Sequence, residues 1–374
     1  MRQELTQHQL REIAAAFDLP GTFSSGRPFG SGHINDTYRL DYLQGHSRRC
    51  YVLQRINTAI FKHPDQLMEN ILRVTGHQRR KLEAAGVTEP ERRVLNFAPA
   101  RDGGYTATAP DGGCWRLCQL VERTHTCDVI ESVDQAFLTA TAFAGFQAGL
   151  VDLPGGRLHE TIPNFHNTAS RFADFAQAAV ENRAGRATAV AAEIEFALAR
   201  RDLAPVLVDL MQQGRIPERI THNDTKLNNI LLDDASGEAL CVIDLDTVMP
   251  GSALYDFGDM VRSSSCTAAE DEADLARVRI NLEMFAALVR GYLSVGRNFL
   301  NPVEIDHLVL SGKLITFEQG IRFLGDYLNG DTYYKIQYPE HNLVRTRNQF
   351  TLVASIEEHE AEMTALVREI IATA

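Results

Sequence analysis

The chain has 374 residues, more than a typical single domain, so we expect two lobes that share a cleft. Its net charge of −12 argues against non-specific nucleic-acid binding, which needs a basic face to displace counterions from phosphates. No apolar run approaches the roughly 20 residues that span a bilayer, and the first residues are polar and amphipathic, unlike a signal peptide. These features predict a cytoplasmic protein with neither a membrane nor a nucleic acid as partner.

The six cysteines show no CxxC spacing that would indicate a metal site or a redox pair. Cys114 and Cys118 fall in one predicted strand, where a separation of four residues does not converge on a metal. We therefore interpret all six as structural thiols in a reducing compartment.

The first part of the chain is predicted to be rich in strands. Residues 6–17 indicate a helix with Thr6 as its N-cap, and residues 65–86 indicate one interior helix. Between and after them, short strands around turns are expected in the ranges 29–42 and 50–56. The segments 94–101, the glycine-rich 102–113 and 115–122 are expected to form a β-hairpin plus a strand. Residues 1–121 are accordingly predicted to form the N-terminal, nucleotide-binding lobe.

From residue 122 the pattern becomes helical. Apolar residues recur at helical spacing in the ranges 132–153, 167–183 and 189–214. Residues 122–374 are therefore predicted to form a mostly helical C-terminal lobe that carries the catalytic and acceptor-binding residues. The expected fold class is α+β.

One segment interrupts this helical pattern and contains the most informative residues. Two short apolar runs, 229–232 and 239–243, flank the turn DDASGE and predict a hairpin. Asp224 precedes the first strand, and Asn229 lies five positions after Asp224. Asp244 follows the second strand. This spacing suits a carboxylate that faces a substrate hydroxyl and two oxygen ligands that approach Mg²⁺ from the two ends of the hairpin. Turn and cap roles are the alternative for such residues.

The motifs HNDTKLNN and VIDLDTV resemble the HxDxxxxN and IDxD signatures of the aminoglycoside phosphotransferase and choline kinase superfamily. The resemblance implies a bilobal, protein-kinase-like fold, with ATP and Mg²⁺ as cofactors. It implies that Asp224 is the catalytic base, that His222 supports the loop, and that Asn229 and Asp244 bind the metal. Asp256 matches the acidic position that braces the catalytic loop. In the usual HGD sequence a glycine stands where this chain has Asn223.

The nucleotide-binding residues implied by the same resemblance are less distinctive. Gly30 and Gly32 occupy a turn that lets backbone N–H groups approach phosphates. The strand position of the usual kinase lysine holds Gln54, with Arg55 beside it, and only one of the two can face the nucleotide. Glu69 is the candidate partner of such a cation or, alternatively, a solvated helix residue. The remaining candidates, for backbone contacts to adenine, are Gln119, Leu120 and Val121.

Four further segments, 29–38, 51–61, 161–171 and 322–353, resemble the bacterial N-acetylhexosamine 1-kinase group, which phosphorylates the anomeric hydroxyl of N-acetylglucosamine or N-acetylgalactosamine. Arg322, Asp326 and Tyr327 are the first candidates for acceptor contacts, because Arg and amide groups pair with ring hydroxyls and an acetamido carbonyl. A packed loop between helices is the alternative for this region. Secondary candidates, for which turn capping is an equal alternative, are His33, Asn35, Asn164 and His166.

These patterns predict an ATP-dependent sugar 1-kinase that works as a monomer or a small homo-oligomer. A kinase of the same fold that acts on an amino alcohol, another sugar or an aminoglycoside remains open. A kinase-like protein that binds nucleotide without turnover is a further alternative, because the usual strand lysine is missing.

Overall fold

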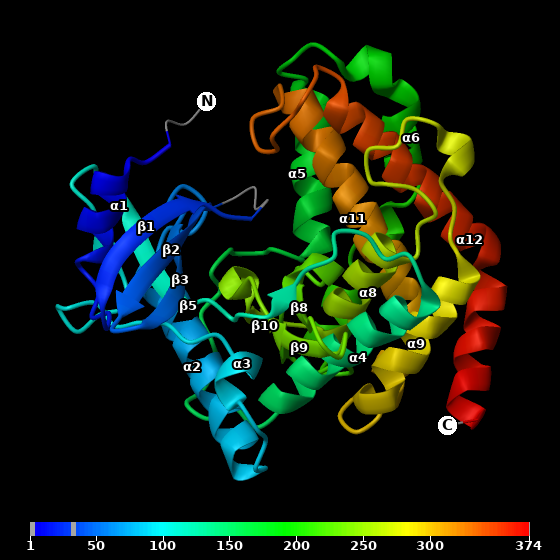
Figure 1. Ribbon diagram of the computed structural model, residues 1–374. Coiled ribbons are helices and arrows are strands. Elements are labelled where there is room, and N and C mark those ends of the chain that lie inside the picture. The colour runs from blue at the N-terminus through cyan, green and yellow to red at the C-terminus, as the bar shows by residue number, and fades with distance from the viewer. Residues whose placement is uncertain (1–3, 31–34, 374) are drawn as a thin grey trace. The chain divides into compact units, whose positions relative to one another are not determined.

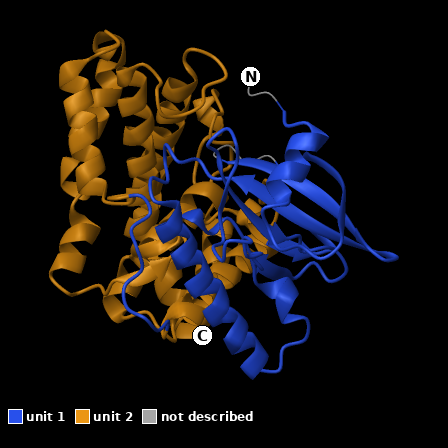
Figure 2. Ribbon diagram, turned by 90° about the vertical axis from the view of Figure 1, so that its left-hand side faces the viewer, with its two compact units in different colours: residues 1–125, 153–162, 231–246 blue, residues 126–152, 163–230, 247–374 orange. Residues whose placement is uncertain are grey.

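The computed structural model describes residues 4–30 and 35–373. Its contacts divide the chain into two compact units (Figure 2). Unit 1 comprises residues 1–125, 153–162 and 231–246, and unit 2 comprises residues 126–152, 163–230 and 247–374. The first unit thus ends its main segment close to residue 121, and it also takes in two later segments that the sequence pattern assigned to the C-terminal lobe.

Unit 1 is built on an antiparallel five-stranded sheet (Figure 1). Its order is β1 (Thr22–Pro28), β2 (Asp36–Gln44), β3 (Ser47–Arg55), β5 (Cys114–Gln119) and β4 (Ala107–Thr108). Alternate residues of the central strands point into one core: Leu40 and Leu53 are fully buried beside Trp115 and Leu117. This sheet confirms the predicted strand-rich first part of the chain.

The described residues of this unit form the helices α1 (Gln7–Ala14), α2 (Pro64–Ala84) and α3 (Pro90–Arg93). α1 begins with the predicted Thr6 cap, because the Thr6 hydroxyl accepts from the Gln9 amide while Gln9 bonds back to the Thr6 amide. Leu10 and Ile13 of α1 pack into the sheet core. α2 agrees with the predicted interior helix and begins at Pro64, which needs no hydrogen bond there.

The predicted strand at 94–101 is wrong, because it contributes only two isolated bridges, Phe97 to Cys118 and Ala100 to Phe17. Pro99 has no N–H, so a continuous ladder cannot pass through this segment. The hairpin after it is confirmed and consists of β4 and β5. The later hairpin is also confirmed: β8 (Ile230–Asp233) lies between β9 (Ala239–Val242) and β6 (Thr124–His125).

Unit 2 is mostly helical, as predicted, with one small sheet in which β7 (Arg219–Thr221) pairs antiparallel with β10 (Met249–Gly251). Its helices are α4 (Val133–Leu150), α5 (Thr168–Glu181), α6 (Ala191–Leu198), α7 (Val206–Gln212), α8 (Ala253–Ser264), α9 (Leu282–Gly296), α10 (Pro302–Asp306), α11 (Leu308–Asn329) and α12 (His341–Thr373). The predicted helical stretch 189–214 is broken into α6, a 3₁₀ turn at Arg201–Leu203 and α7, which begins directly after Pro205.

α11 is the central element of unit 2 and packs against α5, α8 and α12 (Figure 1). α8 approaches it closely at Gly258, where a Cβ would collide with the Ser311 carbonyl oxygen. Since α8 carries Asp256, this close packing fixes the helix that supports the catalytic loop. No described helix is long and apolar enough to cross a bilayer.

Candidate active site

The catalytic loop follows β7 and leads into the short 3₁₀ turn Leu227–Asn229 before β8. Asn223 has a φ of 65°, a left-handed conformation that Asn tolerates better than most residues. Its side chain is used as well, since Nδ2 donates to the Thr247 carbonyl (2.8 Å) and Oδ1 accepts from the Thr221 hydroxyl (2.9 Å). Asn therefore replaces the expected glycine without loss of the turn, and it adds two contacts.

Asp256 on α8 holds this loop through hydrogen bonds to its backbone. Its two oxygens accept the backbone N–H groups of His222 (2.9 Å) and Asn223 (2.7 Å), and Gln147 of α4 donates to it at 2.6 Å. The bracing role expected for Asp256 is confirmed by these contacts. One turn later, Asp259 accepts the Thr225 amide (2.8 Å), a second brace that sequence reasoning missed.

His222 is completely buried, in edge contact with the rings of Phe143 and Phe146 of α4. Its Nδ1 accepts from the backbone N–H of Asp224 (3.3 Å), and its carbonyl accepts from the Thr247 hydroxyl (2.7 Å). Because its ring is enclosed, His222 supports the loop, as the resemblance implied.

Asp224 is the partly exposed carboxylate of the loop, with 30% of its side chain accessible. Lys226 Nζ lies 2.8 Å from Oδ1, and Asn229 Nδ2 donates to Oδ2 at 3.0 Å. Burial alone would raise the pKa of Asp224, but the charge and hydrogen bond of Lys226 outweigh it and lower the pKa to about 2. Asp224 is thus an oriented anion, and Lys226 is a second functional candidate that the sequence analysis did not single out.

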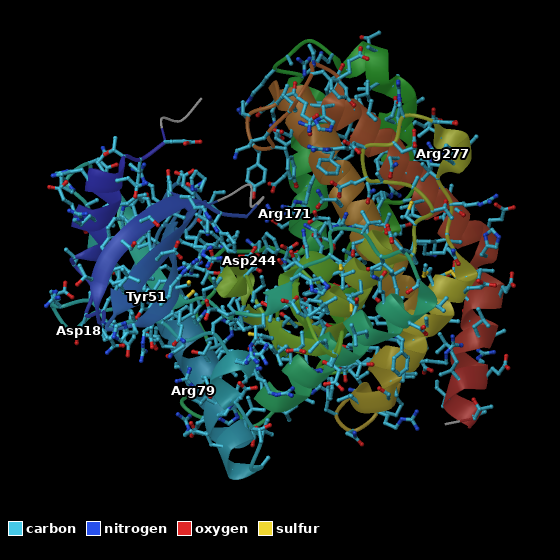
Figure 3. The ribbon with its side chains drawn as sticks, in the orientation of Figure 1. Asp18, Tyr51, Arg79, Arg171, Asp244 and Arg277 are labelled. Carbon is cyan, nitrogen blue, oxygen red and sulfur yellow. The ribbon has the colours of Figure 1, made fainter. Side chains whose placement is uncertain are left out.

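The two predicted metal ligands belong to different units. In unit 2, Asn229 donates its Nδ2 to Asp224, while its Oδ1 has no hydrogen-bond partner in the described part of unit 2. In unit 1, Asp244 follows β9 with a φ of 58°, an uncommon conformation for a residue with a side chain (Figure 3). Both supply the hard oxygen atoms that Mg²⁺ prefers. Their convergence on one ion stays a prediction.

Within residues 4–30 and 35–373 no three His, Cys, Asp or Glu side chains form a cluster that could hold a metal.

In unit 1, Gln54 is itself uncharged but accepts hydrogen bonds from a charged guanidinium group. Arg116, opposite it on β5, donates to Gln54 Oε1 from Nε (3.1 Å) and Nη2 (3.0 Å), and its Nη1 lies 2.5 Å from Asp246 Oδ1. Asp246 also accepts from Asn35 Nδ2 at 2.7 Å. The structure therefore places Asn35, predicted to contact the acceptor, on a carboxylate of the hairpin segment.

The other nucleotide-binding candidates are not all brought together. Arg55 pairs with Asp111 (3.2 Å), and Glu69 contacts His159 (2.9 Å) and Arg73 (3.9 Å). Glu69 is therefore not the partner of Gln54 or Arg55, because its contacts are to residues of its own helix and of the segment 153–162. This corrects the expectation for Glu69.

The three residues proposed for backbone contacts to adenine differ in whether their N–H groups already have hydrogen-bond partners. The amides of Gln119 and Leu120 already donate to Asn96 and Cys50, whereas Val121 N–H has no partner among the described residues. Gly30 has a φ of 78°, and a Cβ added there would meet no heavy atom of the described residues within 4 Å, which suits a phosphate-binding turn. Gly32 and His33 lie outside the described residues.

His166 and Asn164 take supporting positions. His166 is buried, with Nδ1 2.7 Å from Glu318 and Nε2 3.2 Å from the Asn223 carbonyl oxygen. Since both ring nitrogens face acceptors, His166 links α11 to the catalytic loop. Asn164, with a φ of 55°, accepts from Asn167 Nδ2 and caps the turn before α5. These contacts favour the structural alternative for His166, and an acceptor contact at either residue stays a prediction.

Asp326 and Tyr327 also make structural contacts. Asp326 accepts the amides of residues 332–334 and the Asn342 side chain, so its oxygens hold the loop after α11. Tyr327 is buried under the Arg186 guanidinium, 4.4 Å from its ring centre. These contacts favour the packed-loop alternative, and an acceptor contact at either residue stays a prediction.

Arg322 of α11 has no ion pair in the described part of the chain. Its guanidinium lies over the rings of Phe165 (5.2 Å) and Tyr334 (5.8 Å) and donates to Gln319 at 3.3 Å. Arg171 of α5 (Figure 3) donates to the Phe165 carbonyl, and burial together with nearby Arg322 lowers its pKa. An arginine in the first turn of a helix carries no distinctive sequence signal, so Arg171 was missed.

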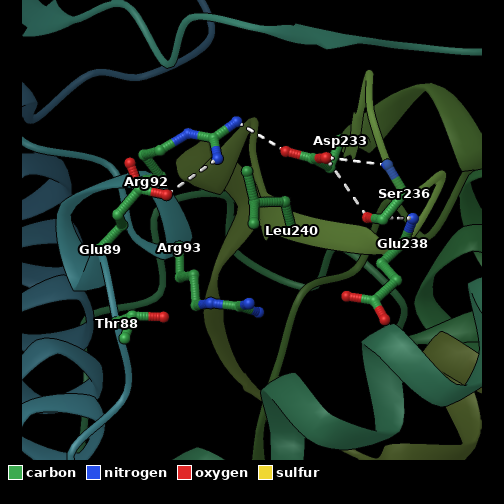
Figure 4. Close-up of a pocket in the computed structure, with 8 residues that line it drawn as sticks. All are labelled: Thr88, Glu89, Arg92, Arg93, Asp233, Ser236, Glu238 and Leu240. Atoms are coloured by element: carbon green, nitrogen blue, oxygen red, sulfur yellow. Dashed lines mark hydrogen bonds and ion pairs between the residues drawn. The ribbon is translucent and has the colours of Figure 1, made fainter.

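A cavity of about 140 Å³ lies elsewhere in unit 1, between α3 and the β8–β9 hairpin (Figure 4). Arg92 crosses it to Asp233 (2.7 Å) and Glu89 (3.4 Å). None of the predicted site residues lines it, so we assign it no part in the chemistry.

Comparison with known proteins identifies the family. Residues 25–292 match the phosphotransferase enzyme family, APH. Because this match spans well over half of the chain, the protein belongs to that family.

Solved structures agree on the fold. An aminoglycoside phosphotransferase from Alicyclobacillus acidocaldarius superposes with a TM-score of 0.57 at 11% identity, covering 100% of this chain and 98% of the other. The spectinomycin phosphotransferase APH(9)-Ia, in complex with ADP and spectinomycin, gives 0.58 at 12%, with coverages of 96% and 100%. A choline/ethanolamine kinase family protein from Mesorhizobium loti gives 0.52 at 16%, with coverages of 97% and 99%. The protein-kinase-like fold implied by the sequence motifs is thereby confirmed.

Proposed function

We propose that the protein transfers the γ-phosphoryl group of ATP to the anomeric hydroxyl of an N-acetylhexosamine, with Mg²⁺ as the metal. The carrying observation is the Asp224, Lys226 and Asn229 constellation on a loop that Asp256 fixes through two backbone amides. Family membership supports phosphoryl transfer, and the similar APH(9)-Ia structure contains ADP.

In the proposed reaction, the acceptor oxygen forms a bond to the γ-phosphorus as the bond to the β–γ bridging oxygen breaks. The acceptor proton passes to Asp224. A carboxylate with a pKa of about 2 is a weak base, so its main contribution is to orient the hydroxyl while the bond to phosphorus forms. An anomeric hydroxyl is more acidic than an ordinary alcohol, which suits a weak base. Lys226 keeps that carboxylate ionised and adds a positive charge next to the reacting oxygen.

Magnesium, when bound, would neutralise phosphate charge as the reaction proceeds. Asn229 Oδ1 and the Asp244 carboxylate are the atoms that we propose as its protein ligands. The glycine turn at Gly30 and the free Val121 amide are proposed to contact phosphates and adenine.

For the acceptor, we propose Arg322 and Arg171 as the recognition residues. Two partly buried guanidinium groups without an ion-pair partner among the described residues suit a carbonyl or hydroxyl oxygen better than a polycationic antibiotic. His166 contacts both Phe165, at a ring distance of 4.7 Å, and the Asn223 carbonyl, so the arginines and the catalytic loop share neighbours within unit 2.

The experiment is an acceptor panel measured by coupled ADP release. N-acetylglucosamine and N-acetylgalactosamine should exceed glucose and galactose by roughly one to two orders of magnitude in kcat/KM, because a site built for an acetamido group leaves buried donors unpaired with simple hexoses. Arg322→Ala should raise the acceptor KM about tenfold and leave the ATP KM unchanged. Arg347→Ala, which removes only a surface pair with Glu193, is the matched control. If choline, homoserine or kanamycin is the best acceptor, the family reaction stands but the sugar assignment fails.

A protein that binds nucleotide without turnover is the remaining alternative. Asp224 is held in one orientation by its contacts, which argues against a protein without turnover. ADP release that does not depend on any acceptor would favour this alternative over transfer to a sugar.

A further inference from the structure

Arg116 is a buried charge in the middle of the unit 1 sheet. Its side chain is 3% exposed, and the Asp246 side chain that it contacts is 4% exposed. A fully enclosed arginine is uncommon unless it is paired or used. The charge therefore needs an explanation beyond the fold of the sheet.

The strand register fixes where the guanidinium points. Arg116 on β5 is the direct partner of Gln54 on β3, and Gln54 Oε1 accepts two of its N–H groups. Gln54 in turn donates to the Thr37 hydroxyl on β2 (3.3 Å). The three strands thus hold one guanidinium in a single orientation, with Nη1 directed at Asp246.

The contact with Asp246 is close. Nη1 and Oδ1 are 2.5 Å apart, so the two charges form a buried ion pair. Nη1 carries two N–H groups and contacts one carboxylate oxygen, so this nitrogen retains capacity for another oxygen. Planar guanidinium groups match phosphate oxygens in both charge and geometry.

The local charges point to the same ligand. Two carboxylates, Asp244 and Asp246, raise the pKa of Arg116 against the opposing effect of burial, which is the largest single influence. The two carboxylates and the one guanidinium together carry a net negative charge, and a bound divalent cation would make the net charge positive. The resulting positive site would complement a polyphosphate.

Asp246 also connects this charge to the residue before β2. Its second oxygen accepts from Asn35, whose own Oδ1 accepts the Asn57 amide. Its carbonyl accepts from the Thr161 hydroxyl at 2.9 Å. One residue thereby contacts Arg116, Asn35 and Thr161.

From these contacts we infer that Arg116 on β5, rather than a residue of β3, is the cation that binds the nucleotide phosphates in unit 1, with Gln54 as its positioning residue. The inference rests on the proposed function, since it requires that the ligand is a nucleotide. The competing explanation is that Arg116 serves only as the counter-ion of Asp246.

A paired substitution separates the two explanations. Arg116→Gln alone leaves Asp246 buried without a partner, so Arg116→Gln is combined with Asp246→Asn, which removes both charges together. Arg116→Met with Asp246→Leu is the apolar version of the same pair, in case the amide pair unfolds. Arg55→Gln removes the neighbouring β3 cation and is the matched control. Thermal unfolding verifies that each variant is folded.

Binding is measured by titration calorimetry of the full chain, with ADP and inorganic tripolyphosphate in the presence of MgCl₂ and with adenosine as a phosphate-free ligand. Our inference predicts that both pair variants lose about tenfold or more in affinity for ADP and tripolyphosphate, while adenosine affinity stays within about twofold. The control should bind all three ligands like the wild type.

Wild-type affinity for ADP in a folded pair variant would overturn the role of Arg116 while leaving the proposed function intact. An equal loss for adenosine and ADP would also contradict it, because the defect would then not concern phosphates. If the wild-type protein itself binds neither ADP nor tripolyphosphate, the proposed function fails first.

Discussion

Asp224 and its neighbours define the chemistry at the scale of single residues. Lys226 and Asn229 each occupy one oxygen of the carboxylate, so its orientation does not depend on a bound ligand. Asp224→Asn keeps the shape but removes the charge and the proton acceptor. We expect kcat to fall by about 10²-fold or more, within the range for loss of a general base, while ADP affinity changes little.

Steady-state kinetics with titration of ADP binding provide this measurement. Asp234→Asn, a change of the same type in the exposed turn of the β8–β9 hairpin, is the control. Near-normal turnover in Asp224→Asn would remove that residue from the reaction.

The metal ligands give a second prediction at this scale. Asp244→Ala and Asn229→Ala should both raise the Mg²⁺ concentration needed for half-maximal activity, and Asp244→Ala should do so more strongly because it removes a full negative charge. Titration of MgCl₂ at fixed ATP measures the effect, with Asp234→Ala as the control. Activity that persists in excess EDTA would contradict the metal assignment altogether.

At the scale of elements, the catalytic loop depends on α8. Asp256→Ala would leave the amides of His222 and Asn223 and the Gln147 side chain without an acceptor in a buried site. Each such loss costs about 1–3 kcal/mol, so the free energy of unfolding should fall by at least that amount and turnover should fall with it. Urea denaturation of Asp256→Ala and Asp256→Asn measures the change. An unchanged midpoint and unchanged activity would show that the brace is dispensable.

The elements themselves were largely predictable from the sequence. Capping and periodicity located α1 and α2, and turn residues located the β4–β5 and β8–β9 hairpins. The segment 94–101 failed because its apolar residues resemble a strand while Pro99 interrupts the ladder. Patterns of this kind report which residues are buried, not whether their backbone groups find partners.

The side-chain contacts of the candidate site were much less predictable. The motif around Asp224 has fixed spacing, so its residues could be named from the sequence. Arg116 could not, because its importance depends on a strand pairing with Gln54 that joins residues 62 positions apart. Asp326 looked like a ligand for the acceptor but holds its own loop, since a carboxylate before a turn serves equally well as a cap.

For the whole molecule, family membership and fold define a phosphotransferase, while the acceptor is our proposal. The central claim is that a phosphoryl group moves from ATP to a small hydroxylated molecule and that Asp224 takes part in this step. The product carries the direct evidence, because a phosphate monoester on a sugar carbon differs from inorganic phosphate in its ³¹P resonance and its coupling to ring protons.

The decisive measurement is therefore ³¹P NMR of reactions that contain the wild-type protein or Asp224→Asn, MgATP and one hexose at a time. With N-acetylglucosamine or N-acetylgalactosamine, the wild type should produce a new monoester resonance coupled to the anomeric proton, together with an equal amount of ADP, and Asp224→Asn should produce almost none in the same time. A monoester coupled to a different carbon would contradict the 1-kinase assignment. ADP with inorganic phosphate as the sole products, across hexoses, amino alcohols and aminoglycosides, would contradict phosphoryl transfer to a small-molecule acceptor.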